Sequence, residues 1–184
     1  GRVIPLHVQF TAGGQPVAGT SLDYFEFREL QMARGESMML LGDCVLGANT
    51  ASELSLSPGD KLKTDRKNLF DLAGDYPLQL NVTGVLSATG TADDEGVFVD
   101  VKTAWIIAGH GHGHDESKSN ATNSLSAKMV KTYLEITPKN MGTFHFHSDT
   151  TALPLTAILV EPMDAKETAM VLSRYQHSDQ LQAL

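Results

Sequence analysis

The chain opens with a run in which apolar and polar positions alternate. Residues 3–10 alternate as a strand with one buried face does, and 11–16 is a cluster of Gly, Gln and Pro typical of a turn. This pattern predicts a hairpin at the start of the chain. Residues 22–30 are predicted as a short helix, because the hydroxyl of Thr20 or Ser21 can accept backbone amides at its first turn.

Short apolar segments predict a sheet-rich middle section. The longest predicted strand is 76–86, in which Leu78 and Leu80 share one face with the alternate positions that follow. A turn at 91–96 is expected to join it to the next strand as a hairpin, and Asp93 and Asp94 are interpreted as turn residues rather than as an acid/base pair. The other predicted elements are strands at 38–41, 44–46, 61–64 and 97–99 and a helix at 48–54.

The last part of the chain alternates helices, strands and one polar segment. A short helix is predicted at 100–108, and the Gly-, Ser- and Asn-rich segment 109–123 is predicted as a loop. The final helix, 164–175, begins with the capping spacing of Asp164 and Glu167. Three further strands are predicted at 133–137, 143–147 and 155–160. Together these elements predict an α+β fold.

Composition and charge restrict the function classes. The 184 residues include 14 Lys and Arg against 22 Asp and Glu, a formal net charge of −8, and no basic run is present. Nucleic acid is therefore not an expected partner. The longest apolar run, 104–108, is far shorter than the ~20 residues of a membrane span, and the start has no basic segment or cleavage site of a signal peptide.

The apolar pattern also predicts which sulfur-containing and aromatic side chains are buried. Cys44 is the single cysteine, so no intrachain disulfide can form, and a buried thiol is expected. Met38, Met39 and Trp105 are likewise predicted to lie in the core.

A series of turns and strand starts has a recognisable order. The residues are Gly19 to Phe25, then Cys44 to Gly47 with Ala51 and Leu54, then Gly59-Asp60, then Val82 to Leu86, then Asp93-Asp94 before Val97 to Val99. In order and spacing, over roughly residues 3–105, they resemble the extracytoplasmic domain of FtsX-like ABC-transporter permeases, the group that contains MacB and LolC/LolE.

The resemblance implies a domain organisation and a set of partners. A porter-like subdomain would be formed by both chain ends (1–34 and 120–184), with a small sheet-rich subdomain (35–105) inserted and a His-rich flexible loop at 106–119. It also implies a periplasmic, non-catalytic domain of a bacterial inner-membrane protein, with no nucleotide site of its own. The implied partners are the transmembrane helices of the same permease, a cytoplasmic ABC ATPase, a second permease copy, and a periplasmic lipoprotein or substrate-binding protein.

Histidines are the candidate chemistry of the sequence, in two clusters. His110, His112 and His114 alternate with glycines, and His145 and His147 alternate with phenylalanines ahead of Asp149. Imidazole is a good Zn²⁺ ligand, and residues two apart on a strand share a face, so His145 and His147 are predicted as a fixed pair. One or more of His110, His112, His114 and Asp149 are expected to complete the ligand shell. The alternative is a solvated His-Gly linker with two half-exposed strand histidines.

Other function classes receive less support from the residues. His7 and His177 have no histidine neighbours and are interpreted as ordinary polar residues. The metalloprotease motif His-Glu-x-x-His, the nucleophile elbow Gly-x-Ser-x-Gly and the phosphate-binding loop are absent from the sequence. The competing hypothesis is a stand-alone periplasmic zinc-binding protein or small zinc hydrolase.

Overall fold

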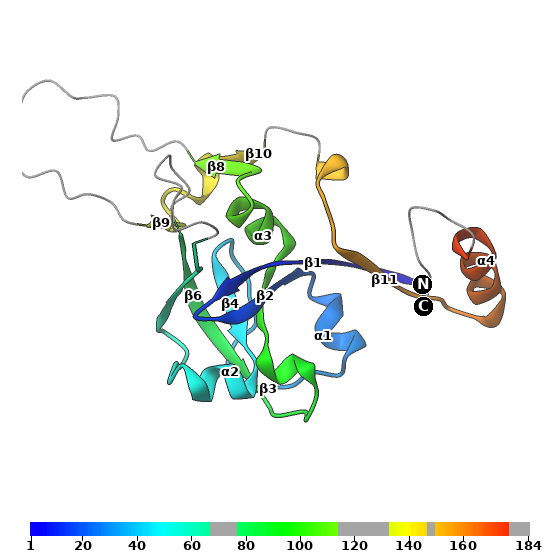
Figure 1. Ribbon diagram of the computed structural model, residues 1–184, viewed down its shortest axis with the longest axis horizontal. Coiled ribbons are helices and arrows are strands. Elements are labelled where there is room, and N and C mark those ends of the chain that lie inside the picture. Colours follow the sequence, from blue (N-terminus) through cyan, green and yellow to red (C-terminus); the bar gives the residue numbers. More distant parts are fainter. Residues whose placement is uncertain (67–76, 114–132, 147–149, 177–184) are drawn as a thin grey trace, which may run out of the picture.

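A large mixed sheet dominates the structure (Figure 1). The computed structural model describes residues 1–66, 77–113, 133–146 and 150–176. Within these residues nine strands form one sheet in the order β11-β1-β2-β7-β4-β6-β3, with β5 and β9 also paired to β6, and β8 and β10 form a separate ribbon. With a few helices on this sheet, the predicted α+β class is confirmed.

The strands and helices have the following bounds. The strands are β1 (Arg2–Ala12), β2 (Gln15–Thr20), β3 (Met32–Gly35), β4 (Asp43–Leu46), β5 (Lys61–Lys63), β6 (Leu78–Leu86), β7 (Val97–Asp100), β8 (Gly111–Gly113), β9 (Leu134–Glu135), β10 (Phe144–Phe146) and β11 (Ala157–Glu161). The helices are α1 (Asp23–Phe27), α2 (Ala48–Glu53), α3 (Val101–Ile107) and α4 (Ala165–Tyr175), with 3₁₀ turns η1 (Ala92–Glu95), η3 (Met141–Thr143) and η4 (Thr150–Ala152).

Strand β4 lies at the centre of the core, and all four of its residues are buried. It runs parallel to β6 and antiparallel to β7. Strand β6 alternates buried and half-buried residues as the apolar pattern predicts, and the predicted burial of Cys44 is confirmed. A strand that is buried on both faces must form its backbone hydrogen bonds with a neighbouring strand on each edge, so β4 lies between β6 and β7.

Strand β1 connects two parts of the molecule. Its first five residues pair with β11, and its remaining residues pair with β2. We call β11, α4 and the first half of β1 the arm, and the rest of the large sheet with α1, α2 and α3 the body; the arm extends away from the body (Figure 1). The first strand and the last strand and helix are therefore neighbours, as expected, whereas the division into two subdomains stays a prediction.

Helix α4 begins as predicted but is little buried. The Asp164 carboxylate accepts a hydrogen bond from the backbone N–H of Glu167 at 2.7 Å, and the Gly1 amino group lies 3.5 Å from the Glu167 carboxylate. Yet no residue of α4 is buried. None of the helices in the described ranges has the length and apolarity that crossing a bilayer requires.

Segment 38–41 is not a strand, contrary to the prediction. The Asp43 carboxylate accepts hydrogen bonds from the backbone N–H groups of Met39 and Leu40, which hold this segment in a turn. Met38 is buried as predicted, but Met39 is 74% exposed, so its assignment to the core was wrong. The strand that pairs with β6 at this edge is β3.

Three other local predictions needed correction. Helix α1 has Leu22 as its N-cap residue and no side-chain cap hydrogen bond, so neither Thr20 nor Ser21 caps it. The turn at 91–96 does not join a hairpin, because β4 lies between β6 and β7. The predicted loop after α3 contains β8, which pairs with β10.

Close packing between α3 and β2 gives a first prediction. A Cβ atom added at Gly19 would lie 2.3 Å from the Cβ of Ala104, so Gly19→Ala must push α3 from the sheet. We expect a loss of about 1–3 kcal/mol in the free energy of unfolding, measured by urea denaturation. Gly142→Ala is the matched control, because an added Cβ there meets nothing within 4 Å. Equal stability of the two variants would contradict the observed packing.

Candidate functional site

The two histidine clusters meet in the ribbon of β8 and β10. These strands are antiparallel, and His112 is directly opposite His145 in the register. The ribbon lies next to α3, beside the body of the molecule (Figure 1). Strand pairing thus brings together two predicted ligands that are 33 positions apart in the sequence.

The phenylalanine face of the ribbon packs onto the core. Phe144 and Phe146 are partly buried against the main hydrophobic cluster, and the Phe146 ring contacts Trp105 edge-on with 6.1 Å between ring centroids. Gly111 gives room for this ring, since a Cβ there would lie 2.9 Å from it. His145, between the two phenylalanines, is exposed.

The ring of His145 has a defined hydrogen bond. Its Nδ1 lies 3.1 Å from the carbonyl oxygen of Thr143. A carbonyl oxygen only accepts hydrogen bonds, so Nδ1 is the donor.

Three of the six predicted metal ligands lie in the part of the chain that the structure describes. His110 is half-buried, and its backbone N–H donates to the carbonyl of Trp105 at 2.9 Å. His112 and His145 occupy opposed positions of the ribbon, whereas the other three predicted ligands lie outside the described residues: His114, His147 and Asp149. Among the side chains that are described, no group of three His, Cys, Asp or Glu could hold one ion.

Of the two isolated histidines, His7 lies in the described part of the chain, and it is buried. His7 is only 1% exposed on β1, and its ring centroid lies 5.8 Å from that of Phe10. His177 lies outside the described residues.

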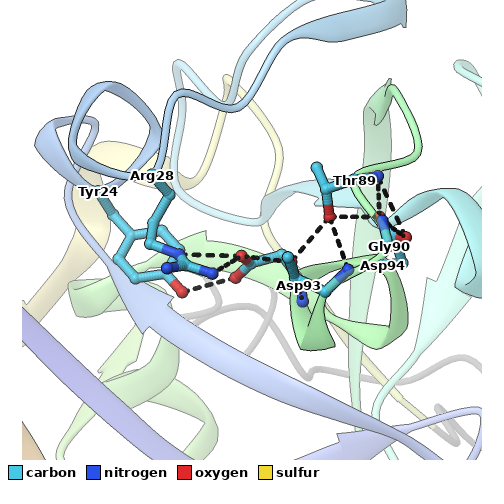
Figure 2. Close-up of polar contacts among 7 residues, drawn as sticks. Tyr24, Arg28, Thr89, Gly90, Asp93 and Asp94 are labelled. Carbon is cyan, nitrogen blue, oxygen red and sulfur yellow. Dashed lines mark hydrogen bonds and ion pairs between the residues drawn. The ribbon is translucent and has the colours of Figure 1, made fainter.

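Asp93 is the centre of a buried polar network that the sequence did not reveal (Figure 2). Its carboxylate accepts hydrogen bonds from the Tyr24 hydroxyl at 2.6 Å and from Arg28 Nη2 at 2.7 Å. Its side chain is 7% exposed and that of Arg28 is 39% exposed. The network ties η1 to the α1 region over the body of the sheet.

The ionisation of this network suits a structural role. Burial alone raises the pKa of Asp93, but hydrogen bonds from Tyr24 and Arg28 outweigh it and hold that pKa below its ordinary value. Burial, followed by the hydrogen bond to Asp93, raises the pKa of Tyr24 to about 12. Asp93 therefore stays charged and Tyr24 stays protonated at neutral pH.

Asp94 makes a separate set of contacts within its own loop. Its carboxylate accepts hydrogen bonds from the backbone N–H groups of Thr89 and Gly90, at 2.9 Å and 2.8 Å (Figure 2). The backbone hydrogen bond from Thr89 is the main cause of the lowered pKa of Asp94. The two carboxylates therefore hold the loop in place and do not form an acid/base pair.

An open groove lies between α4 and the paired ends of β1 and β11. Its volume is about 380 Å³, and its lining includes Val3, Val160, Met170 and Tyr175. Val3 is 64% exposed and Met170 is 63% exposed, so much of this apolar lining faces outward.

Comparison with solved structures gives two similar domains. One is the periplasmic region of MacB from Actinobacillus actinomycetemcomitans, with 16% identity and a TM-score of 0.41 over 56% of this chain and 50% of that one. The other is the extracellular domain of the noncanonic ABC-type transporter YknZ from Gram-positive bacteria, with 15% identity and a TM-score of 0.44 over 59% of this chain and 58% of that one.

The chain thus matches less than two thirds of the length of either structure. No protein-family model and no curated protein matches the sequence.

The Asp93 network gives a stability prediction. Asp93→Asn removes the charge that accepts hydrogen bonds from Tyr24 and Arg28, and it leaves the guanidinium without its ion-pair partner. We expect the free energy of unfolding to fall by about 2–3 kcal/mol at pH 7, measured by chemical denaturation. Asp23→Asn is the control, because that carboxylate is exposed. A loss at Asp93 no larger than at Asp23 would contradict the proposed role.

The lowered pKa of Asp93 also predicts a pH dependence. The unfolded chain has an aspartate pKa of about 3.9, so between that value and the lower folded value the unfolded state binds more protons. The stability due to ionised Asp93 is therefore complete above the unfolded pKa and is lost as pH falls through the folded pKa. We expect the stability difference between wild type and Asp93→Asn to be constant from about pH 7 to 5 and to shrink below about pH 4. A difference that grows on acidification would contradict this assignment.

Proposed function

We propose that this chain is the extracytoplasmic domain of an FtsX-like ABC-transporter permease. It acts as a mechanical and docking element and has no catalytic role. ATP hydrolysis belongs to a separate cytoplasmic ATPase, and its energy reaches this domain through transmembrane helices that continue from the arm. Two copies of the domain then move against each other outside the membrane.

One observation supports this proposal above the others: the first strand, β1, lies together with the last described strand and helix, β11 and α4, in the arm. Arg2 is paired with Glu161, and their side chains form an ion pair at 2.6 Å. The backbone nitrogen of Gly1 also lies near the Glu167 carboxylate of α4. A domain held by two membrane anchors requires both ends at the same face, and this pairing meets that requirement.

The arm suits a role beside other parts of a transporter. Its exposed apolar side chains include Val3, Ile158, Met163 and Met170, with exposed fractions of 49% to 76%. Apolar patches of this kind are typical of interaction surfaces. The proposed neighbours are the second permease copy and the other segments of this protein, while a periplasmic lipoprotein or substrate-binding protein docks on the body.

The histidine ribbon adds a finer proposal, in which a metal ion such as Zn²⁺ is a cargo or a regulator of the transporter. The observation that favours it is the opposed placement of His112 and His145. The same observation also suits the competing hypothesis of a stand-alone periplasmic zinc-binding protein. The two hypotheses differ in whether the protein is anchored in the membrane.

Surface labelling of the full-length protein in cells tests the proposal. Cys44 is buried and burial raises the pKa of its thiol, so Cys44 itself contributes little background with maleimides. Met39→Cys places a thiol at a 74% exposed position of the body. We expect a membrane-impermeant maleimide to label this variant in intact cells, and the labelled protein to sediment with the inner membrane after lysis.

Met38→Cys is the matched control, because Met38 is 4% exposed and its thiol should react only after denaturation. Labelling of Met39→Cys only in broken cells would refute the extracytoplasmic location. Labelling in intact cells with release of the protein into the soluble fraction would favour the stand-alone zinc-binding protein.

A further inference from the structure

We propose that Arg2 is a latch that sets the orientation of the arm on the body, because its guanidinium binds one carboxylate of each part at the same time. The two carboxylates are those of Glu161 in β11 and Glu26 in α1. The contact with Glu26 opens while the contact with Glu161 stays closed, so the latch is reversible. The latch is a property of this chain, and only its use in transport rests on the proposed function.

The contact with Glu161 belongs to the arm itself. Arg2 and Glu161 are directly opposed in the antiparallel pair of β1 and β11, and Arg2 Nε donates to the Glu161 carboxylate at 2.6 Å. Opposed positions in such a pair keep their side chains close together. The guanidinium therefore moves with the arm and keeps its other nitrogens available for a second partner.

The contact with Glu26 is the one that reaches the body. Arg2 Nη1 donates to the Glu26 carboxylate at 2.7 Å. A guanidinium carries its donors on three nitrogens in a fixed plane, so it can hold two carboxylates at once. The hydrogen bond to Glu161 is the main cause of the raised pKa of Arg2, and the charges of Glu26 and Asp23 add to it, so Arg2 keeps its charge.

Helix α1 is firmly attached to the body, so Glu26 is a fixed point for the latch. Phe25 of this helix is buried, and its ring centroid lies 5.6 Å from that of Phe98 in β7. The Tyr24 hydroxyl of the same helix donates to the Asp93 carboxylate at 2.6 Å. A force that reaches Glu26 is therefore carried by the core and by the network around Asp93.

The inner and outer parts of the arm are attached to the body in different ways. Ile4 is fully buried, and the Thr20 hydroxyl donates to the Pro5 carbonyl at 2.9 Å, so the inner part is held by packing and by the body strand β2. The outer part extends away from the body (Figure 1), and no residue of α4 is buried. Among the described residues, the ion pair that joins this outer part to the body is Arg2 with Glu26. The orientation of the outer arm therefore depends on this pair.

The exposure of the pair suits a contact that opens. The side chains of Arg2 and Glu26 are 38% and 77% exposed. An exposed ion pair shifts an equilibrium by about two- to fivefold, and salt weakens it. The latch therefore favours one orientation of the arm without fixing it permanently, and a pull on the outer arm can release it.

Pulsed EPR distances between the arm and the body test the latch. Nitroxide labels are attached through Met39→Cys in the body and Met163→Cys in the arm, because both positions are exposed, whereas Cys44 is buried. We expect one dominant distance when the latch is intact. Glu26→Lys replaces attraction to Arg2 by repulsion and should raise the population of other distances by about two- to fivefold.

Glu29→Lys is the matched control for Glu26→Lys. It makes the same charge reversal at a nearby exposed position that follows α1. We expect the distance distribution of this control to equal that of the labelled protein without it. The same distribution in Glu26→Lys and in Glu29→Lys would overturn the latch.

Salt provides a second test, which needs no substitution in the latch. Raising NaCl from about 0.05 M to about 1 M should broaden the distance distribution of the labelled protein, because screening weakens an exposed ion pair. A distribution that salt does not change would overturn the proposal, even if Glu26→Lys failed to fold. Neither measurement depends on the labelling test in cells, so the latch and the transporter role can fail separately.

Discussion

The arrangement of the body depends on the close approach of η1 to Gly47. A Cβ at this position would lie 2.3 Å from the carbonyl oxygens of Asp93 and Asp94, so only glycine fits. The backbone N–H of Gly47 donates to the Gly96 carbonyl at 2.8 Å, directly after the central strand β4 ends. This contact places η1 so that Asp93 can bind Arg28, and thereby α1 is held against the sheet.

The arm is attached to the body in a different way. Strand β1 pairs first with β11 and then with β2. The register of the β1–β2 pair shifts between Val8 and Phe10, near the point where the partner of β1 changes. The body end of β1 belongs to the main core, whereas α4 has no buried residue. Burial of apolar area is the main stabilising term in folding, so the arm is less stabilised than the body and relies more on backbone pairing.

Local patterns in the sequence predict most elements, but they do not predict pairings between distant segments. The strands and helices at β1, β6, α3 and α4 follow from alternation and capping signals. The insertion of β4 between β6 and β7, and the pairing of β8 with β10, depend on tertiary contacts that no local signal contains. The same reason explains why the sequence predicts two histidine clusters but not the opposed pair, and why it does not predict the contacts of Asp93 with Tyr24 and Arg28.

Trp105 of α3 connects the histidine ribbon to the arm. Its ring packs against Phe146, and its Nε1 donates to the carbonyl of Pro154 at 2.8 Å, just before β11 begins. On the preceding residue, the Cβ of Ala104 lies against Gly19 of β2, so α3 has little room to shift against the sheet. A ligand that fixes the ribbon therefore acts on the same indole that holds the start of β11. In a close-packed interior, this indole gives the ribbon a direct contact with the segment that leads into β11.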